Sequence, residues 1–130
     1  MYANAAKSYG AKQYADVHVG NAGEASPHRL IQMLMEGLLA RINSAKGAIQ
    51  HQDYEAKSLY ISKAIGIVGG LNEAIDLDKG GEIAANLHQL YNYMTNRLLQ
   101  ASKENSLEML DEVSSLMRDV KEAWDAIADA

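Results

Sequence analysis

Apolar side chains recur every three or four residues from about residue 28 to the end of this chain, and that spacing constrains its fold most. Such a period is typical of amphipathic helices, whereas strands alternate with a period of two. The single proline, Pro27, stands at the start of the pattern, so no proline breaks the helices that follow. The pattern therefore predicts an all-helical region over residues 26–130.

Capping residues mark the start of the first two predicted helices. Ser26 is a favourable N-cap, and the proline after it occupies the first helical position, where proline is preferred. The apolar set of this helix continues as far as His51. Asp53 is predicted to cap the second helix.

The third and fourth helices are separated from their neighbours by polar stretches. The link "DLDKGG" breaks the apolar pattern, so the third helix is predicted to start near Gly81–Glu82. In "NSLE", Asn105 is predicted to cap the fourth helix, and Glu108 at the third helical position completes a capping box.

Four such helices joined by short links pack as antiparallel neighbours. The predicted fold is an all-α, up-down-up-down four-helix bundle over residues 26–130, preceded by an irregular segment over residues 1–25. This segment is small and polar, with scattered tyrosines and valines. Two interpretations are open: a flexible, frayed tail, or a cover whose Tyr14 and Val17 lie on an apolar surface of the bundle.

The charge distribution excludes several classes of partner. The net charge is −5, and residues 103–130 account for all of it, because basic and acidic residues balance over residues 1–102. Without a basic stripe, nucleic acid and anionic membrane surfaces are poor partners. The chain has no cysteine, no apolar run of membrane-spanning length and no apolar stretch typical of a signal peptide. A cytosolic protein without membrane insertion is therefore predicted.

Motifs that carry catalysis or metal binding are missing from the sequence. Metal sites in helical bundles use Glu-x-x-His pairs on facing helices, and the chain has none. The four histidines match no ligand spacing. The glycine-rich stretches lack the setting of a phosphate loop, and no nucleophile motif is present. No enzyme activity, metal or cofactor is predicted.

The second and third helices carry more apolar residues than one bundle stripe requires, which is about three positions in seven. Ile61 and Ile65 stand beside the stripe of the second helix, and Ile83 and Leu90 beside that of the third. Either neighbours on two sides widen the buried face, or the surplus forms an exposed groove for an amphipathic helix of a partner.

Three glycines lie within the second helix, in "KAIGIVGGLNEAI". Each costs about 0.5–1 kcal/mol relative to alanine in a helix, yet the apolar stripe continues on both sides of them. The gaps at Gly66 and Gly69 would admit a close backbone, either of a neighbouring helix or of a client. We expect these two to flank a client groove and Gly70 to serve packing.

Several stretches together resemble the FliS family of flagellin export chaperones. They cover most of residues 14–127 in the family's order: "YADVHV", "ASPHRLIQMLMEG", "KAIGIVGGLNEAID", "KGGEIAANLHQLYNYM" and "WDAI". The chain departs from the family pattern at Met35, where tyrosine is usual, and methionine is a conservative filler there.

The resemblance implies a chaperone of the bacterial cytoplasm that binds the disordered C-terminal segment of flagellin. It would thereby prevent premature polymerisation and help deliver flagellin to the flagellar type III export gate. It further implies that Tyr14 and Val17 cover the groove when no client is bound. Carried over by position, the flagellin groove comprises Ile61, Ile65, Val68, Leu87, Leu90, Tyr91 and Met94.

A second hypothesis is a regulatory helical binding module that sequesters a regulator such as an anti-sigma factor. The same groove could serve both roles, because one apolar groove accepts different amphipathic helices. A third, a metalloprotein or enzyme bundle, is disfavoured by the missing Glu-x-x-His pair and the isolated histidines.

Overall fold

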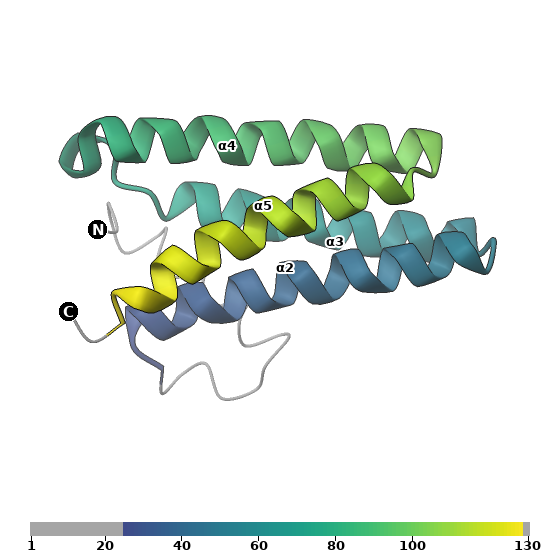
Figure 1. Cartoon of the computed structure of the whole chain (residues 1–130), viewed down its shortest axis with the longest axis horizontal. Helices are drawn as coiled ribbons and strands as arrows, with labels where there is room; N and C mark the ends of the chain where they lie inside the picture. The colour runs from purple at the N-terminus through teal and green to yellow at the C-terminus, as the bar shows by residue number, and fades with distance from the viewer. Residues whose placement is uncertain (1–24, 129–130) are drawn as a thin grey trace.

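The computed structural model describes residues 25–128, which form four α-helices with short connections (Figure 1). The helices are α2 (Pro27–Gln50), α3 (Tyr54–Glu73), α4 (Leu77–Glu104) and α5 (Leu107–Ala126). Tyr14 and Val17 lie outside the described residues.

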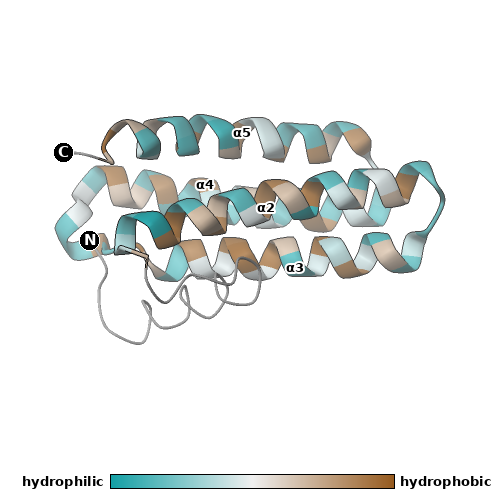
Figure 2. Ribbon diagram, turned by 90° about the horizontal axis from the view of Figure 1, so that it is seen from below, coloured by the Kyte–Doolittle hydropathy of each residue, from teal (hydrophilic) through white to brown (hydrophobic). Residues whose placement is uncertain are grey.

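Each helix runs antiparallel to the one before it, and all four lie along one long axis (Figure 1). Both α2 and α4 pack against α3 and α5, so α2 and α4 are diagonal neighbours. Figure 2 shows hydrophobic residues interleaved with hydrophilic ones along every helix, as expected where one face of each helix is buried. The predicted all-α four-helix bundle is confirmed.

The first two predicted N-caps are confirmed. The Ser26 hydroxyl accepts a hydrogen bond from the backbone N–H of Arg29 at 3.1 Å. The Asp53 carboxylate accepts one from the N–H of Ala56 at 3.1 Å. Each bond satisfies a donor that has no partner within its own helix.

The predicted cap of the last helix was wrong by one residue. Asn105 ends α4 in the left-handed conformation, at φ 53° and ψ 43°, which asparagine tolerates better than most residues. The hydroxyl of Ser106 caps α5 instead and accepts from the N–H of Met109 at 3.1 Å. Glu108 is therefore the second helical residue, and the predicted capping box does not form.

The start predicted for the third helix also needs correction. Asp76 is the N-cap, and its carboxylate accepts from the N–H groups of Asp78 and Lys79, both at 3.1 Å. One helical turn precedes a break at Gly81, whose φ of 57° and ψ of −133° suit only glycine well. A side chain at Gly80 would collide with the Cβ of Ala84. The "DLDKGG" link thus contains a first turn of α4 that is set at an angle to the rest.

The core runs along the bundle axis between the four helices. Leu38, Ile42, Leu98, Leu110 and Met117 are completely enclosed, and burying each such side chain contributes roughly 1.5–3 kcal/mol to folding. α3 is continuous through its glycines, so the apolar stripe on both sides of them correctly predicted a helix.

Candidate functional site

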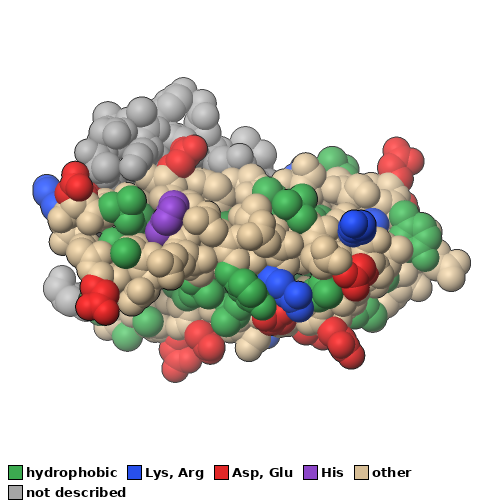
Figure 3. All heavy atoms as spheres, turned by 90° about the horizontal axis from the view of Figure 1, so that it is seen from above, with side chains coloured by type: hydrophobic (Ala, Val, Ile, Leu, Met, Phe, Trp, Pro, Cys, Tyr) green, Lys and Arg blue, Asp and Glu red, His purple; other side chains and the backbone are tan. Residues whose placement is uncertain are grey.

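A hollow of about 610 Å³ opens between the N-terminal half of α4 and the C-terminal half of α5. We call it the α4–α5 groove. Figure 3, which looks onto α4, shows hydrophobic side chains gathered on this side of the molecule. The groove is lined by Ile31, Met35, Leu71, Ala74, Ile75, Asp76, Lys79, Gly80, Ile83, Ala84, Asn86, Leu87, Leu90, Tyr91, Val120, Ala123, Trp124 and Ile127.

The apolar residues of each groove wall lie on one face of their helix. On α4, Ile83, Leu87 and Leu90 recur at spacings of three and four and therefore share one face. Across the groove, Trp124 and Ile127 of α5 do the same. Ile83 is 80% exposed and Ile127 51% exposed, so the walls present apolar surface that the bundle itself does not cover. Exposed apolar surface of this kind marks a binding site.

Polar groups stand at the rim of the groove. Asp76, Lys79 and Asn86 are its lining residues with charged or amide side chains. The backbone N–H of Lys79 donates to the Asp76 carboxylate and thereby lowers the pKa of Asp76. This carboxylate is thus committed to capping α4, which leaves the interior of the groove apolar.

Beyond the residues that line the groove, α4 and α5 are joined by a clasp of three side chains. Both Tyr93, through its hydroxyl, and Arg97, through Nε at 2.8 Å, donate to the carboxylate of Glu112. The hydrogen bond from Tyr93 and the nearby guanidinium of Arg97 lower the pKa of Glu112. The same bond to the carboxylate raises the pKa of the Tyr93 hydroxyl. The clasp holds the two helices together at this point.

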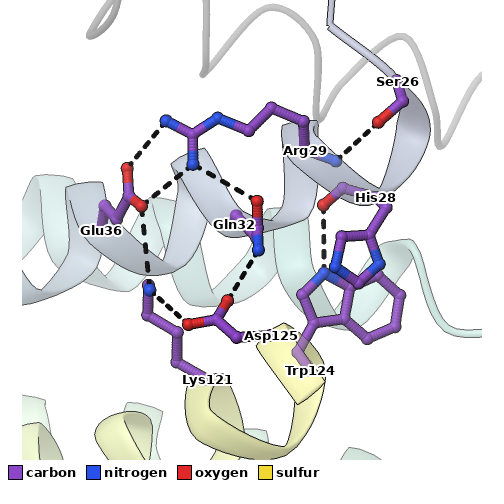
Figure 4. A network of polar contacts seen from close by, with 8 residues as sticks. All are labelled: Ser26, His28, Arg29, Gln32, Glu36, Lys121, Trp124 and Asp125. Atoms are coloured by element: carbon purple, nitrogen blue, oxygen red, sulfur yellow. Dashed lines mark hydrogen bonds and ion pairs between the residues drawn. The ribbon is translucent and has the colours of Figure 1, made fainter. Parts of the chain in front are cut away.

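The opposite end of α5 is attached to α2 instead of α4. The indole Nε1 of Trp124 donates to the backbone oxygen of His28 at 3.0 Å (Figure 4). The two rings stack with centroids 4.3 Å apart and planes 6° from parallel. This contact orients Trp124 so that it forms part of the groove wall.

Ionic contacts reinforce the attachment of α5 to α2 (Figure 4). The Gln32 amide donates to Asp125 at 2.7 Å, and Lys121 donates to the other oxygen of Asp125 at 2.7 Å. Lys121 also lies 3.8 Å from Glu36. Because α5 is held to α4 at the clasp and to α2 at its far end, α4 and α5 diverge toward the C-terminus of α5 (Figure 1). The α4–α5 groove lies in this part of the bundle.

The contacts of Asp125 predict a pH dependence of stability. The hydrogen bond from Lys121, with a second from Gln32, lowers the pKa of Asp125 below its ordinary value, which is about 3.9 in an unfolded chain. Ionised Asp125 therefore stabilises the fold above that value, and the contribution is lost as pH falls through the folded-state pKa. In urea denaturation between about pH 5 and pH 2, Asp125→Asn should lose less unfolding free energy than the wild type.

The matched control for this titration is Asp119→Asn, which removes an exposed carboxylate from the same helix. Its unfolding free energy should fall with pH as the wild-type value does. A decline in Asp125→Asn as steep as that of the control would show that the Lys121 and Gln32 contacts do not stabilise the ionised form.

Only some of the groove residues that were predicted from sequence line the α4–α5 groove. Leu87, Leu90 and Tyr91 line the α4–α5 groove, although Tyr91 is itself buried at 2% exposure. By contrast, Ile61 is 2% exposed and Met94 0% exposed. A further set is placed on α3 outside the groove: Val68 is buried in the core, Ile65 is partly buried against the core, Gly66 is partly buried and Gly69 is exposed.

Ile61, which the family resemblance placed in the flagellin groove, lies in the core instead. For this residue the broad-core interpretation holds, because α3 packs against both α2 and α4 and so buries a wider sector than one stripe. At Gly69, a Cβ would meet nothing within 4 Å. Glycine is therefore not required there by packing among the described residues.

Sequence reasoning missed the α5 side of the groove. Val120, Trp124 and Ile127 belong to the apolar stripe of the last helix and read as ordinary core residues. The surplus of Ile83 and Leu90 on the third helix was the one available signal, and both residues do line the groove.

Residues 25–128 contain no cluster of potential ligands that could hold a metal ion. Within the same range, no helix has the length and apolar character needed to cross a membrane.

The protein is an all-helical bundle with an open apolar groove, and the charged residues of the groove lie at its rim. These features are typical of proteins that bind a segment of a partner protein. The model of the family described as flagellar protein FliS matches residues 9–130. The chain belongs to the FliS family, as its sequence motifs predicted, and this is a chaperone family and not an enzyme family.

The sequences of curated relatives align with this chain over most of their length. The flagellar secretion chaperone FliSB of Pseudomonas aeruginosa is 48% identical over 118 residues, which are 90% of this chain and 94% of that protein. The flagellar secretion chaperone FliS of Salmonella typhimurium is 44% identical over 121 residues, 92% and 90% of the two chains. That of Bacillus subtilis is 34% identical over 111 residues, 85% and 82%.

Proposed function

We propose that this flagellar export chaperone binds the disordered C-terminal segment of flagellin in the cytoplasm. By covering that segment it prevents premature polymerisation, and it helps deliver flagellin to the flagellar type III export apparatus. The observation that carries the proposal is the α4–α5 groove, whose apolar walls the bundle leaves uncovered.

The groove suits a client that folds on binding. An amphipathic helix buries its apolar face in such a groove, while its polar face stays in water. A disordered client loses conformational entropy when it orders, so a large contact surface is needed to hold it. We therefore place the client contacts at Leu87 and Leu90, as predicted from sequence, with the buried Tyr91 beneath them, and add Ile83, Val120, Trp124 and Ile127.

The other residues that were predicted from sequence have supporting roles in the proposed function. Ile65, Gly66 and Gly69 lie on α3, where a second part of a long client could continue. Tyr14 and Val17 are proposed to cover client-binding surface in the absence of client. Ile61, Val68 and Met94 act through packing, since they are buried.

Calorimetric titration with a peptide that covers the C-terminal segment of the same organism's flagellin tests this function. We expect saturable one-to-one binding, a negative heat-capacity change from apolar burial, and a gain of helical circular dichroism on mixing. A well-folded protein that gives no binding heat at several temperatures would exclude the proposed client.

A further inference from the structure

Two aromatic rings line the α4–α5 groove, and their surroundings differ. Tyr91 is 2% exposed and is therefore fixed by the close packing of the core around it. Trp124 is only partly buried, so part of its ring is available to a client. Tryptophan is enriched among the residues that dominate binding energy at protein interfaces. The orientation of Trp124 therefore matters for any client of this groove.

The hydrogen bond and the ring stack of Trp124 both join it to one residue, His28 in the first turn of α2 (Figure 4). The hydrogen bond goes to the backbone oxygen of His28, and it still permits the indole to tilt about the N–H···O direction. The parallel stack on the imidazole fixes the plane of the indole as well. The side chain of His28 therefore supplies a constraint that its backbone oxygen alone does not.

Burial of the His28 imidazole is not explained by hydrogen bonding. Its Nε2 atom is buried and has no hydrogen-bond partner among residues 25–128. A buried polar atom without a partner destabilises a fold, because its contacts with water are lost and not replaced. The stack with Trp124 is a favourable contact that offsets this cost.

The imidazole can be separated from the contacts that hold the helix itself. The hydrogen bond between Gln32 and Asp125 attaches α5 to α2 in the same region, and it does not involve His28. Moreover, His28 is not one of the residues that line the groove, whereas Trp124 is. Loss of the imidazole is therefore expected to release the indole ring without detaching α5, and to affect a client only through Trp124.

We propose that His28 is a positioning residue for client binding. Its imidazole holds the Trp124 ring in one orientation before a client arrives, so this part of the α5 wall is preformed. A client that meets a preformed wall binds more tightly, because no free energy is lost in ordering that side chain. The inference rests on the proposed function, since it assigns a role in binding the same client at the same groove.

Three substitutions at His28 test this role. His28→Ala removes the stack and keeps the backbone oxygen, while His28→Leu fills the volume without a planar ring. Both should weaken calorimetric binding of the flagellin segment about fivefold, the size expected of one aromatic pair and one immobilised side chain. His28→Phe keeps a planar ring without the unpartnered nitrogen, so its affinity should stay within about twofold of the wild-type value.

The tryptophan itself reports whether its ring is held. The chain has one tryptophan, so time-resolved fluorescence anisotropy of the client-free protein observes Trp124 alone. His28→Ala and His28→Leu should show nanosecond motion of the indole that the wild type and His28→Phe lack. The matched control is His51→Ala, which removes an exposed histidine at the other end of α2. It should change neither the anisotropy nor the affinity.

An immobile indole in both His28→Ala and His28→Leu would overturn the inference. Wild-type affinity in these two variants, or an equal loss in His28→Phe, would overturn it as well, because a planar ring would then not matter. Unfolding of all three variants, measured by circular dichroism, would assign His28 a structural role instead. If the wild type itself failed to bind the flagellin segment, the proposed function would be refuted together with this role, whereas the other outcomes refute the role of His28 alone.

Discussion

Replacing Ile83 with aspartate is expected to weaken binding of the flagellin segment by at least about 30-fold, as expected for a central apolar contact of an interface. Ile83 lines the groove and is 80% exposed, so its side chain is available to a client. Because it contributes little to the core, the unfolding free energy should change by less than about 0.5 kcal/mol. Calorimetric titration and urea denaturation of the same preparation measure the two effects.

The matched variant on the neighbouring helix is Ile65→Asp. Ile65 is partly buried against the core, so a buried carboxylate there should lower the unfolding free energy by about 1–3 kcal/mol. If Ile83→Asp bound the client as the wild type does, while a folded Ile65→Asp did not, the client site would lie on α3 and α4 rather than in the α4–α5 groove.

Leu98→Ala is expected to lower the unfolding free energy by about 3 kcal/mol, the cost of a cavity at an enclosed leucine. Leu98 is 0% exposed and lies in the core of the bundle. For a domain of this size, such a loss corresponds to a fall of roughly 10 °C in the melting temperature. Urea and thermal denaturation followed by circular dichroism measure it.

The control for the cavity left by Leu98→Ala is a substitution at the next residue, Leu99. Leu99 is 55% exposed, and Leu99→Ala removes the same atoms from the next position of the same helix. Its effect should stay within about 0.5 kcal/mol. Similar losses in both variants would contradict the assignment of Leu98 to the core and of Leu99 to the surface.

Local sequence signals predicted the helices well. Ser26 and Asp53 cap their helices through side-chain oxygens, and the geometry of these caps involves residues only three positions apart. The error at Asn105 is also local, since asparagine and serine are both good caps. Asparagine takes the left-handed position that ends α4, and this assigns the cap of α5 to Ser106.

The α4–α5 groove depends on contacts between helices, and the spacing of apolar residues along the sequence does not reveal these contacts. Residues 93 positions apart, Gln32 and Asp125, hold the end of α5 against α2. Trp124 and His28, 96 positions apart, do the same. Without knowledge of these pairs, Trp124 and Ile127 are indistinguishable from core residues, because a helix carries the same apolar stripe whether a neighbour covers it or not.

The amino-acid sequence alone determined that this chain forms four amphipathic helices in an antiparallel bundle, and its motifs indicated the FliS family. These properties follow from spacing, capping and local order along the chain. Only the tertiary structure decided that Ile61 and Met94 are buried while Ile83 and Ile127 stay exposed. The physical reason is that burial depends on how far neighbouring helices diverge, and the attachment of α5 to α4 at one end and to α2 at the other sets that divergence.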